Sequence, residues 1–521
     1  MKLSNVHVIG GGPAGLFAAI LLRRASHLTR VVVHERSVPD ETFGFGVAFT
    51  RRTLDILAGA SASVVEKLRE ASVDMPPQEM RIGSHSVQSG GNAGGITIAR
   101  SALLKALLDQ AREVGVEVRL GDEAVASDFP EADLVIAADG VSSATRASLA
   151  KELGEHVTPG RGVFMWLGCD RRLETNLFAP ARTDAGLFNI HCYPYSNNAS
   201  TIGVETDLAT WRLAGMDVWT ADTPLGDSDK KSIDYLQDVF GEILGGATLL
   251  GNRSRWMHFR TVTADRWSAG NIVLIGDAAH TAHYSVGSGT KMAMEDAVAL
   301  VEALNIPGND DLGQALRLYE TNRRPGAEYL QNLADRSRWW WESLEERLHL
   351  APPLLMAAYL SRGGAVSATR LAELDPDLLD SALLSAGLPG SSARPRQLVD
   401  DVLSSSINVA GQQLSSRILD DSTPLKVASL QADIHDPWGA EAGLAVEAAV
   451  SLAAGGADIL VLTGAGAREA VLDRVALAEH IRLRSGAAVA VEAFRQQAED
   501  LVDALIAQRI DLVRFTPAND A

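Results

Sequence analysis

The chain has 521 residues, of which 46% are hydrophobic and 22% charged, and its formal net charge is −19. This length and composition predict a globular protein of two or three domains, and the negative charge excludes nucleic acid and anionic membrane surfaces as partners, since both require clustered basic residues. No apolar run reaches membrane-spanning length and the first strand is predicted from Asn5, so we expect no membrane contact, no signal peptide and a cytosolic protein.

The N-terminal segment predicts a strand, a glycine turn, a helix and a second strand. It reads NVHVIGGGPAGLFAAILLRRA, and Glu35 closes the next strand, RVVVHER, about 20 residues after the last glycine. Gly10 permits the tight turn, Gly12 lets a pyrophosphate approach the backbone, and Gly15 lets helix and strand pack closely. Glu35 would accept hydrogen bonds from ribose hydroxyls. This pattern predicts binding of NAD or FAD by Gly10, Gly12, Pro13, Ala14, Gly15, Glu35 and Arg36.

Two later strands end in short acidic motifs. ADLVIAADGVSSATR contains Asp139, and NIVLI leads into Gly276 and Asp277. Together with the glycine turn, these segments resemble the fingerprint of the single-component (group A) flavoprotein aromatic hydroxylases. The resemblance extends over residues 1–345.

The resemblance implies an α/β fold with a Rossmann-like FAD-binding domain. In such proteins the glycine turn holds the FAD diphosphate, the DG segment, here with Asp139, lies along FAD and the incoming nicotinamide, and the GD aspartate, here Asp277, binds the ribityl chain. Arg100, at the start of a predicted helix, corresponds to an arginine near the FAD phosphate and ribityl chain; an exposed helix-terminal charge is the alternative. A later helix, starting at Gly287, Ser288 and Gly289, would direct its N–H groups at the flavin's pyrimidine edge, where reduction places negative charge.

The loop before that helix departs from the commonest family pattern, in which prolines follow GDAAH. His283 and Tyr284 stand there instead, and Lys291 replaces an asparagine. Because this loop would face the reactive edge of the flavin, His283 and Tyr284 are the candidate catalytic residues; a hydrogen bond to the loop backbone is the alternative role of His283. The stretch HTAHYSVGSGTKMAMEDA resembles a narrower subgroup, the hydroxylases of salicylyl-CoA and anthraniloyl-CoA, with violacein-pathway hydroxylases more distant.

Between the acidic motifs, over about residues 155–265, alternating runs predict an inserted antiparallel sheet: GVFMWLGCD, GLFNIHCYPYS and STIGVETD. This sheet would cover the flavin and bind the substrate. Cys169 and Cys192 lie in these runs, and we expect buried free thiols. Phe45, in the FGFG segment, resembles the family's flavin-proximal loop, with ordinary turn packing as the alternative.

After Trp341 the composition predicts a helical linker region over residues 346–424. Four apolar runs separated by helical stretches then predict a partial β/α barrel over residues 425–521. This part resembles the end of an old yellow enzyme barrel, a TIM-barrel-like fold that carries FMN. At the positions that would hold FMN phosphate the chain reads VEAF and RFTP, and a turn without glycine does not let the backbone approach phosphate closely. We therefore expect FAD but no FMN.

These features predict an FAD-dependent monooxygenase that uses O2 and NAD(P)H, with NADH favoured. The resemblance implies that a flavin C4a-hydroperoxide transfers oxygen to the ring of an aryl-CoA thioester, as in conversion of salicylyl-CoA to gentisyl-CoA. A free phenol or indole is the alternative substrate. A flavin-binding scaffold without catalysis is the alternative of another class, and no metal is expected.

The CoA phosphates require local cations, because the chain as a whole is acidic. The candidates are Phe45 for the substrate ring and Arg51, Arg52, Arg323 and Arg324 for the phosphates. For each arginine, a solvated surface charge is the alternative. The sequence leaves the oligomeric state open, a homodimer included.

Overall fold

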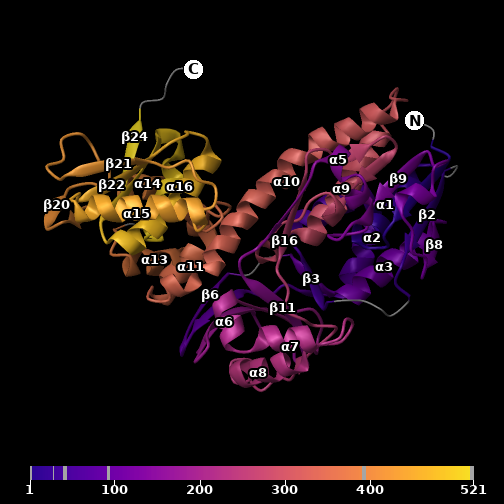
Figure 1. The fold of residues 1–521 in the computed structure, drawn as a ribbon, viewed down its shortest axis with the longest axis horizontal. Coiled ribbons are helices and arrows are strands. Elements are labelled where there is room, and N and C mark those ends of the chain that lie inside the picture. The colour runs from indigo at the N-terminus through magenta and orange to yellow at the C-terminus, as the bar shows by residue number, and fades with distance from the viewer. Residues whose placement is uncertain (1–2, 27–28, 39–43, 91–93, 390–394, 517–521) are drawn as a thin grey trace. The chain divides into compact units, whose positions relative to one another are not determined.

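The computed structural model describes residues 3–26, 29–38, 44–90, 94–389 and 395–516. It divides the chain into two compact units, of which the first holds Met1–Gly83 and Gly91–Ala334, and the second Ser84–Gly90 and Asp335–Ala521. Figure 1 follows the chain through both units from indigo to yellow. Phe43 in the FGFG segment and Pro517 in RFTP lie outside the described residues.

The first unit contains a six-stranded sheet with the order β17-β18-β9-β1-β2-β8. All neighbours are parallel except β17 and β18. The strands are β1 (Asn5–Ile9), β2 (Arg30–Glu35), β8 (Glu117–Leu120), β9 (Leu134–Ala137), β17 (Ser268–Ala269) and β18 (Ile272–Leu274). β1, NVHVI, is almost fully buried, as expected for a central parallel strand. The carboxyl ends of β1, β9 and β18 therefore meet at one edge, which is where ligands of such sheets bind.

Helices and a small sheet surround this edge. α1 (Pro13–Ala25) packs on α3 (Arg100–Glu113) and α9 (Gly289–Leu304) in one large apolar core. β3 (Gly46–Phe49), β7 (Ile96–Ala99) and β4 (Ser72–Asp74) form a three-stranded sheet. The remaining elements of this part are α2 (Arg51–Glu70), α4 (Ala144–Ser148), α5 (Ala150–Leu153), β10 (Glu155–Pro159), β16 (Arg260–Ala264) and the start of α10 (Leu312–Glu342).

A second sheet of the first unit confirms the predicted antiparallel insertion. Its strands run in the order β15-β11-β14-β13-β12-β5 and pair antiparallel, except that β12 and β5 are parallel. They are β5 (Gln78–Ile82), β11 (Val163–Cys169), β12 (Asn176–Thr183), β13 (Gly186–Pro194), β14 (Ser200–Thr206) and β15 (Leu249–Leu250). Cys169 and Cys192 are buried and free, as predicted.

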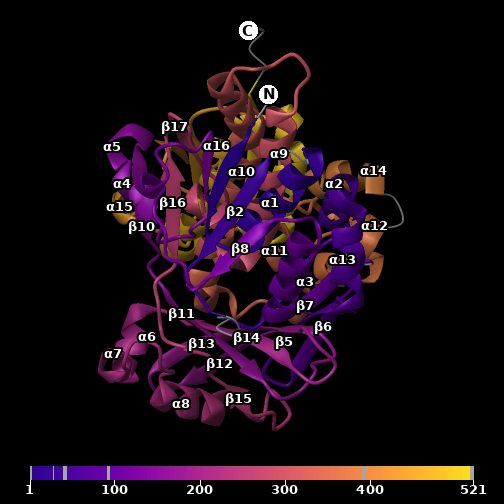
Figure 2. The same ribbon diagram turned by 90° about the vertical axis from the view of Figure 1, so that its right-hand side faces the viewer.

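One face of this sheet is apolar and is covered by helices. Met165, Ile190, Ile202 and Val204 pack in a core with α6 (Leu208–Leu213), α7 (Met216–Asp222) and α8 (Lys230–Phe240), which lie along the sheet in Figure 2. Because side chains alternate along a strand, their neighbours in sequence point to the opposite face, which is thus available for a site.

The second unit ends in a parallel sheet with the order β21-β22-β23-β24. These strands, β21 (Val427–Gln431), β22 (Ile459–Thr463), β23 (Ala488–Phe494) and β24 (Leu512–Thr516), alternate with α15 (Ala440–Ala454), α16 (Arg468–Ser485) and α17 (Ala498–Ile506). The four predicted strands are confirmed; their origin in a TIM-type barrel stays a prediction. The segment before them holds α11 (Pro352–Ser361), α12 (Ala368–Leu374), α13 (Pro376–Ser385) and α14 (Pro395–Leu403).

A hairpin in the linker region was not predicted. β19 (Ile407–Val409) and β20 (Gln412–Leu414) pair around Ala410 and Gly411, whose φ angles are 49° and 80°. Val409 packs in one cluster with Ile459, Val461 and Ala490 of the parallel sheet, and Leu414 packs against that cluster. The hairpin therefore covers apolar sheet surface that would otherwise face water, and strands of three residues are too short to show a period in the sequence.

Candidate functional site

The three sequence motifs meet at the carboxyl ends of β1, β9 and β18. Gly10 has a φ of +102°, and a Cβ there would lie 2.3 Å from the carbonyl oxygen of Ala138. A Cβ on Gly15 would lie 2.1 Å from the carbonyl oxygen of Gly10. A Cβ on Gly276 would lie 3.3 Å from that of Ala14, so the GD motif packs on the start of α1. Glycine is thus required where the backbone segments touch each other.

Two helices at this edge begin without a side-chain cap. Gly12 is the N-cap of α1, which continues with the buried Pro13, and apart from Gly12 itself and its two chain neighbours no described heavy atom lies within 4 Å of a Cβ built on Gly12. The same open space surrounds Gly287 and Gly289 at the start of α9. Ser288, the N-cap of α9, turns its hydroxyl to the Val286 carbonyl oxygen at 3.2 Å. Such ends offer N–H donors and a partial positive charge to an anionic group.

Acidic side chains line the same edge. Glu35 accepts hydrogen bonds from the backbone N–H of Gly11 at 2.7 Å and of Ser37 at 2.8 Å, and its neighbour Arg36 is exposed. Asp139 accepts from the N–H of Thr145 at 3.1 Å through Oδ2, while its Oδ1 is buried and has no partner among the residues described. A buried acceptor of this kind calls for a donor from a ligand or water.

Asp277 is accessible to solvent but is surrounded by protein groups. Loss of solvation raises the pKa of its carboxyl, against the lowering effects of His280 and Arg100. The carboxyl thus keeps contact with solvent while His280 and Arg100 act on its charge. Arg100, at the start of α3, is half-buried and acts on the charge of Asp277; its backbone N–H donates to the Phe45 carbonyl oxygen at 2.7 Å.

Arg146 joins the two acidic motifs, a role that the sequence did not reveal. Its buried guanidinium donates to the carbonyl oxygens of Val141 at 2.8 Å and Ala278 at 2.9 Å, and Nε donates to Glu155 at 2.7 Å. It thereby ties the segment after Asp139 to the segment after Asp277. The only signal in the sequence is an arginine shortly after the DG motif.

The segment around Phe45 is clamped between α3 and the antiparallel sheet. A Cβ on Gly168 of β11 would lie 2.5 Å from the Phe45 ring, so the ring packs directly on the β11 backbone. The hydroxyl of Tyr193 donates to the Gly46 carbonyl oxygen at 2.8 Å. Phe45 is therefore half-buried and fixed in place.

The loop with His283 and Tyr284 lies against the uncovered face of the antiparallel sheet. The Tyr284 ring centroid is 4.7 Å from that of Phe164, 5.3 Å from that of Trp166 and 6.0 Å from that of Phe259. His283 is buried, with Nδ1 2.9 Å from the Ser285 hydroxyl. The structure brings both candidate residues into one aromatic wall, defined by Phe164, Trp166, Phe259, His283 and Tyr284.

A polar cluster behind this wall escaped the sequence analysis. The Tyr284 hydroxyl donates to Glu205 Oε2 at 2.5 Å, and His191 Nε2 contacts the other carboxylate oxygen. Burial opposes ionisation of Glu205, yet His191, His283 and Tyr284 together lower the pKa of its carboxyl to about 2. Glu205 is therefore a carboxylate at neutral pH. The sequence STIGVETD shows that Glu205 lies on an otherwise apolar strand. It does not show the pairing register that places Glu205 opposite Asn189 of β13.

The four arginines proposed for substrate binding differ in their surroundings. Arg51 and Arg52 are exposed at the start of α2. Arg323 donates to Asp296 at 2.8 Å, and Arg324 donates to the carbonyl oxygens of Ala264 and Asp265 at 3.0 Å. The Arg324 guanidinium is thus engaged by protein acceptors, whereas Nη2 of Arg323 is buried and has no hydrogen-bond partner among the residues described.

Metal-binding clusters and membrane-spanning helices are both absent from the described part of the chain. It contains no group of three or more His, Cys, Asp or Glu side chains placed to hold a metal ion. Nor do the helices there include one with the length and apolar content needed to cross a membrane.

Comparison with known proteins gave consistent matches. A family model described as FAD binding domain matches residues 4–129 and 86–334. The chain is 43% identical over 339 residues to salicyloyl-CoA 5-hydroxylase from Streptomyces sp., a match that covers 65% of each chain and thus slightly less than two thirds of that relative. It is 37% identical over 381 residues to 3-hydroxy-4-methyl-anthranilyl-[aryl-carrier protein] 5-monooxygenase from Streptosporangium sibiricum, covering 71% of this chain and 97% of the relative.

Solved structures share the fold. The tetrameric form of 2-methyl-3-hydroxypyridine-5-carboxylic acid oxygenase superposes with a TM-score of 0.52 at 24% identity, over 73% of this chain and 98% of that one. At this identity the likeness concerns the fold alone.

Proposed function

The chain belongs to the FAD binding domain family, and we propose that it is an FAD-dependent monooxygenase that hydroxylates the aromatic ring of an aryl-CoA thioester. The observation that carries this proposal is the loop Asp277–Gly289, one end of which holds the accessible Asp277 at the sheet edge, while the other lies at a helix N-terminus without a side-chain cap. Tyr284, between these ends, belongs to the aromatic wall. A long redox cofactor and an aromatic substrate would thus both contact this loop.

The residues at this edge fit FAD. Open space at Gly12 suits the diphosphate, and open space at Gly287 and Gly289 suits the flavin ring. The partnerless Oδ1 of Asp139 and the accessible carboxyl of Asp277 suit the hydroxyl groups of the ribityl chain. The chemistry that bound FAD supplies is its reduction by NAD(P)H and the activation of O2.

The chain's own residues would bind and orient the reactants. We infer that Glu35 binds the ribose, that Arg100 lies near the phosphate and ribityl chain, and that Phe45 flanks the ring system. Phe164, Trp166 and Phe259 would hold the substrate ring and exclude water from the reacting atoms. His283 and Tyr284 would contact the substrate from the loop side.

The carrier of the aryl group is suggested by the relatives. Their names place an aryl group on coenzyme A in one protein and on an aryl-carrier protein in the other. We propose that the exposed Arg51 and Arg52 bind CoA phosphates through charge-assisted hydrogen bonds. Arg323 and Arg324 remain candidates for the same role, although each also donates to a protein oxygen.

The test compares a hydroxybenzoyl-CoA with its free acid, using the FAD-loaded chain, NADH or NADPH, and detection of the hydroxylated product. We expect turnover of the thioester with kcat/KM at least about tenfold higher than for the acid, which corresponds to about 1.4 kcal/mol from the CoA contacts. Added salt should raise the KM of the thioester only. Equal turnover of acid and thioester would favour a free small aromatic as substrate, and binding of FAD without any turnover would favour a scaffold.

We expect the purified chain to contain one FAD and no FMN. The glycine turn and the helix N-termini without side-chain caps can bind one dinucleotide. β23, in contrast, ends in VEAF, whose side chains hinder close approach of an FMN phosphate to the backbone. Chromatography of the flavin released by denaturation measures both. FMN in stoichiometric amount would contradict the interpretation of the C-terminal sheet.

A further inference from the structure

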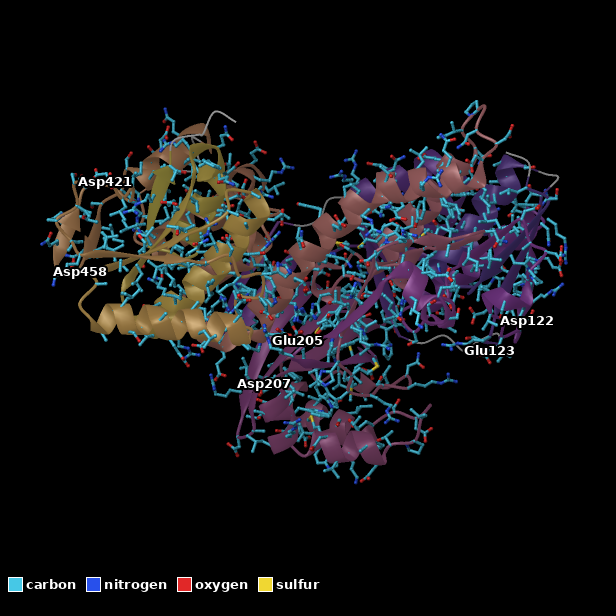
Figure 3. All side chains as sticks on the ribbon, turned by 45° about the horizontal axis from the view of Figure 1, so that its top comes forward. Asp122, Glu123, Glu205, Asp207, Asp421 and Asp458 are labelled. Carbon is cyan, nitrogen blue, oxygen red and sulfur yellow. The ribbon has the colours of Figure 1, made fainter. Side chains whose placement is uncertain are left out.

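A group of cations lies at the start of α9, although the chain as a whole is acidic. The formal net charge is −19, and the acidic residues labelled in Figure 3 come from both units. Lys291 is the third residue of α9, whose first turn contains no acidic side chain. Nζ of Lys291 lies 3.9 Å from Glu295 Oε1, and Nη1 of Arg323 lies 3.6 Å from Glu295 Oε2. Arg52 of α2 acts on the charge of the same carboxyl.

Lys291 occupies a position where a lysine destabilises its own helix. The N–H groups of the first turn carry partial positive charge, which repels a cation there. An acidic residue four positions later can offset this repulsion, as in α8, where Lys230 Nζ lies 2.8 Å from Asp234. In α9 the corresponding distance is longer, and Glu295 Oε1 is buried without a hydrogen bond from the described residues. Lys291 is thus a half-buried cation with a loosely held partner.

The nearby carboxyl groups do not compensate the cations. Burial raises the pKa of Glu295, against the lowering effects of Lys291, Arg323 and Arg52. Asp296 accepts a hydrogen bond from Nε of Arg323 at 2.8 Å and contributes the other negative charge. Even with both carboxyl groups ionised, three cations face two anions. The start of α9 therefore carries net positive charge.

This charge acts differently on the two redox states of FAD. The open space at Gly287 and Gly289, which suits the flavin ring, lies within four residues of Lys291 in the chain. Hydride transfer from NAD(P)H brings two electrons and one proton to FAD, releases NAD(P)⁺, and leaves one negative charge on the pyrimidine part of the ring system. The oxidised ring system has no such charge. A fixed cation beside it therefore favours the reduced state.

We propose that Lys291 stabilises the negative charge of reduced FAD and thereby raises the reduction potential of the bound cofactor. This inference rests on the proposed function, because it requires FAD with its ring at the start of α9. Lys291 stands where the commonest family pattern has an asparagine, which carries no charge. The repulsion within α9 and the loose pairing with Glu295 are consequences of keeping a cation at this place.

The experiment measures the midpoint potential of the FAD-loaded chain by stepwise reduction in the presence of a reference dye. Lys291→Met keeps an unbranched side chain and removes the charge. It should weaken binding of reduced FAD relative to oxidised FAD at least about tenfold, which lowers the potential of a two-electron couple by about 30 mV. Lys291→Arg keeps the charge, and its affinity ratio should stay within about threefold of the wild-type ratio.

The pH dependence of the potential is a second readout, because it counts the protons taken up with the two electrons. One proton gives a slope of about 30 mV per pH unit, and two protons give about 59 mV per pH unit. The slope changes at the pH where the reduced ring system loses its second proton. In Lys291→Met this pH should be higher by about one unit, since the anionic form has lost its cation.

Lys230→Met is the matched control. Lys230 also lies in the first turn of a helix and pairs with an acidic residue four positions later, but α8 belongs to the apolar core of the antiparallel sheet. Its potential and slope should equal those of the wild type. Thermal unfolding of the apoproteins shows whether each variant is folded, and Lys291→Met should be at least as stable as the wild type, because the repulsion within α9 is removed.

Each outcome either supports the inference or overturns it. Wild-type potential and slope in folded Lys291→Met overturn it and leave FAD binding and hydroxylation intact. A lowered potential that Lys291→Arg shares also overturns it, because the charge is then not the cause. If Lys291→Met does not fold, Lys291→Gln gives the same comparison. A wild-type chain that binds no FAD contradicts the proposed function and overturns this inference with it.

Discussion

Gly12→Ala is expected to release FAD from the protein without unfolding it. Gly12 has φ −73° and ψ 179°, which alanine adopts readily, and the new methyl group would have no described heavy atom within 4 Å other than those of residue 12 and its chain neighbours. The free energy of unfolding of the apoprotein should therefore stay at the wild-type value. The methyl group would occupy the space above the helix N-terminus into which a diphosphate must fit, so FAD affinity should fall at least about tenfold, or about 1.4 kcal/mol.

Gly10→Ala is the matched comparison, because it adds the same atom two residues away. Its Cβ would lie 2.3 Å from the Ala138 carbonyl oxygen, and its φ is +102°. The left-handed backbone costs roughly 1–2 kcal/mol and overpacking about 1–3 kcal/mol more, so this variant should lose both FAD and thermal stability. The measurements are thermal unfolding of the apoproteins and titration with FAD. Wild-type FAD affinity in Gly12→Ala would show that no diphosphate lies on this turn.

The sequence predicted those features whose cause is local. The glycine turn, the acidic residues after strands and the apolar runs of both sheets each depend on a few neighbouring residues. Strands β11, β13 and β14 of the antiparallel insertion and the four strands of the C-terminal sheet follow the predicted runs, whereas β12 was not predicted. Positive φ at Gly10 and open space at Gly12 are consequences of the same short motif. That the three motifs serve one cofactor was implied by the resemblance, and the parallel strands bring their carboxyl ends to one edge.

Features that depend on distant pairing were not predictable. Glu205 approaches Tyr284 because of the register between β13 and β14 and the path of a loop nearly eighty residues later, as the sequence separation of 79 shows. Arg324 stays a candidate phosphate ligand, but the sequence did not reveal that it donates to the carbonyl oxygens of Ala264 and Asp265 at 3.0 Å. Its partners lie about sixty residues earlier in the chain, at separations of 60 and 59, and no local pattern reveals them.

Arg146→Met is expected to destabilise the first unit strongly. Arg146 is only 3% exposed, and its loss would leave the carboxylate of Glu155 without its partner and the carbonyl oxygens of Val141 and Ala278 without donors. Removing one partner of a buried ion pair costs about 3–5 kcal/mol. Because these bonds also fix the backbone after Asp277, FAD affinity should fall together with the free energy of unfolding.

Urea unfolding of the apoprotein, with and without a second substitution, separates two costs of losing Arg146. One is the unpaired carboxylate of Glu155, and the other is the loss of donors to the carbonyl oxygens of Val141 and Ala278. Glu155→Gln in the Arg146→Met background removes the uncompensated charge, so it should restore part of the lost stability but little of the FAD affinity, since the carbonyl oxygens remain without donors. Arg260→Met is the control, because Arg260 is exposed and donates to the Ser142 hydroxyl close to the same segment; it should change stability by less than about 0.5 kcal/mol. Wild-type stability in Arg146→Met would mean that the segments around Val141, Glu155 and Ala278 keep their positions without this guanidinium. The packing of the glycines against neighbouring backbone would then be sufficient to hold this edge of the sheet together.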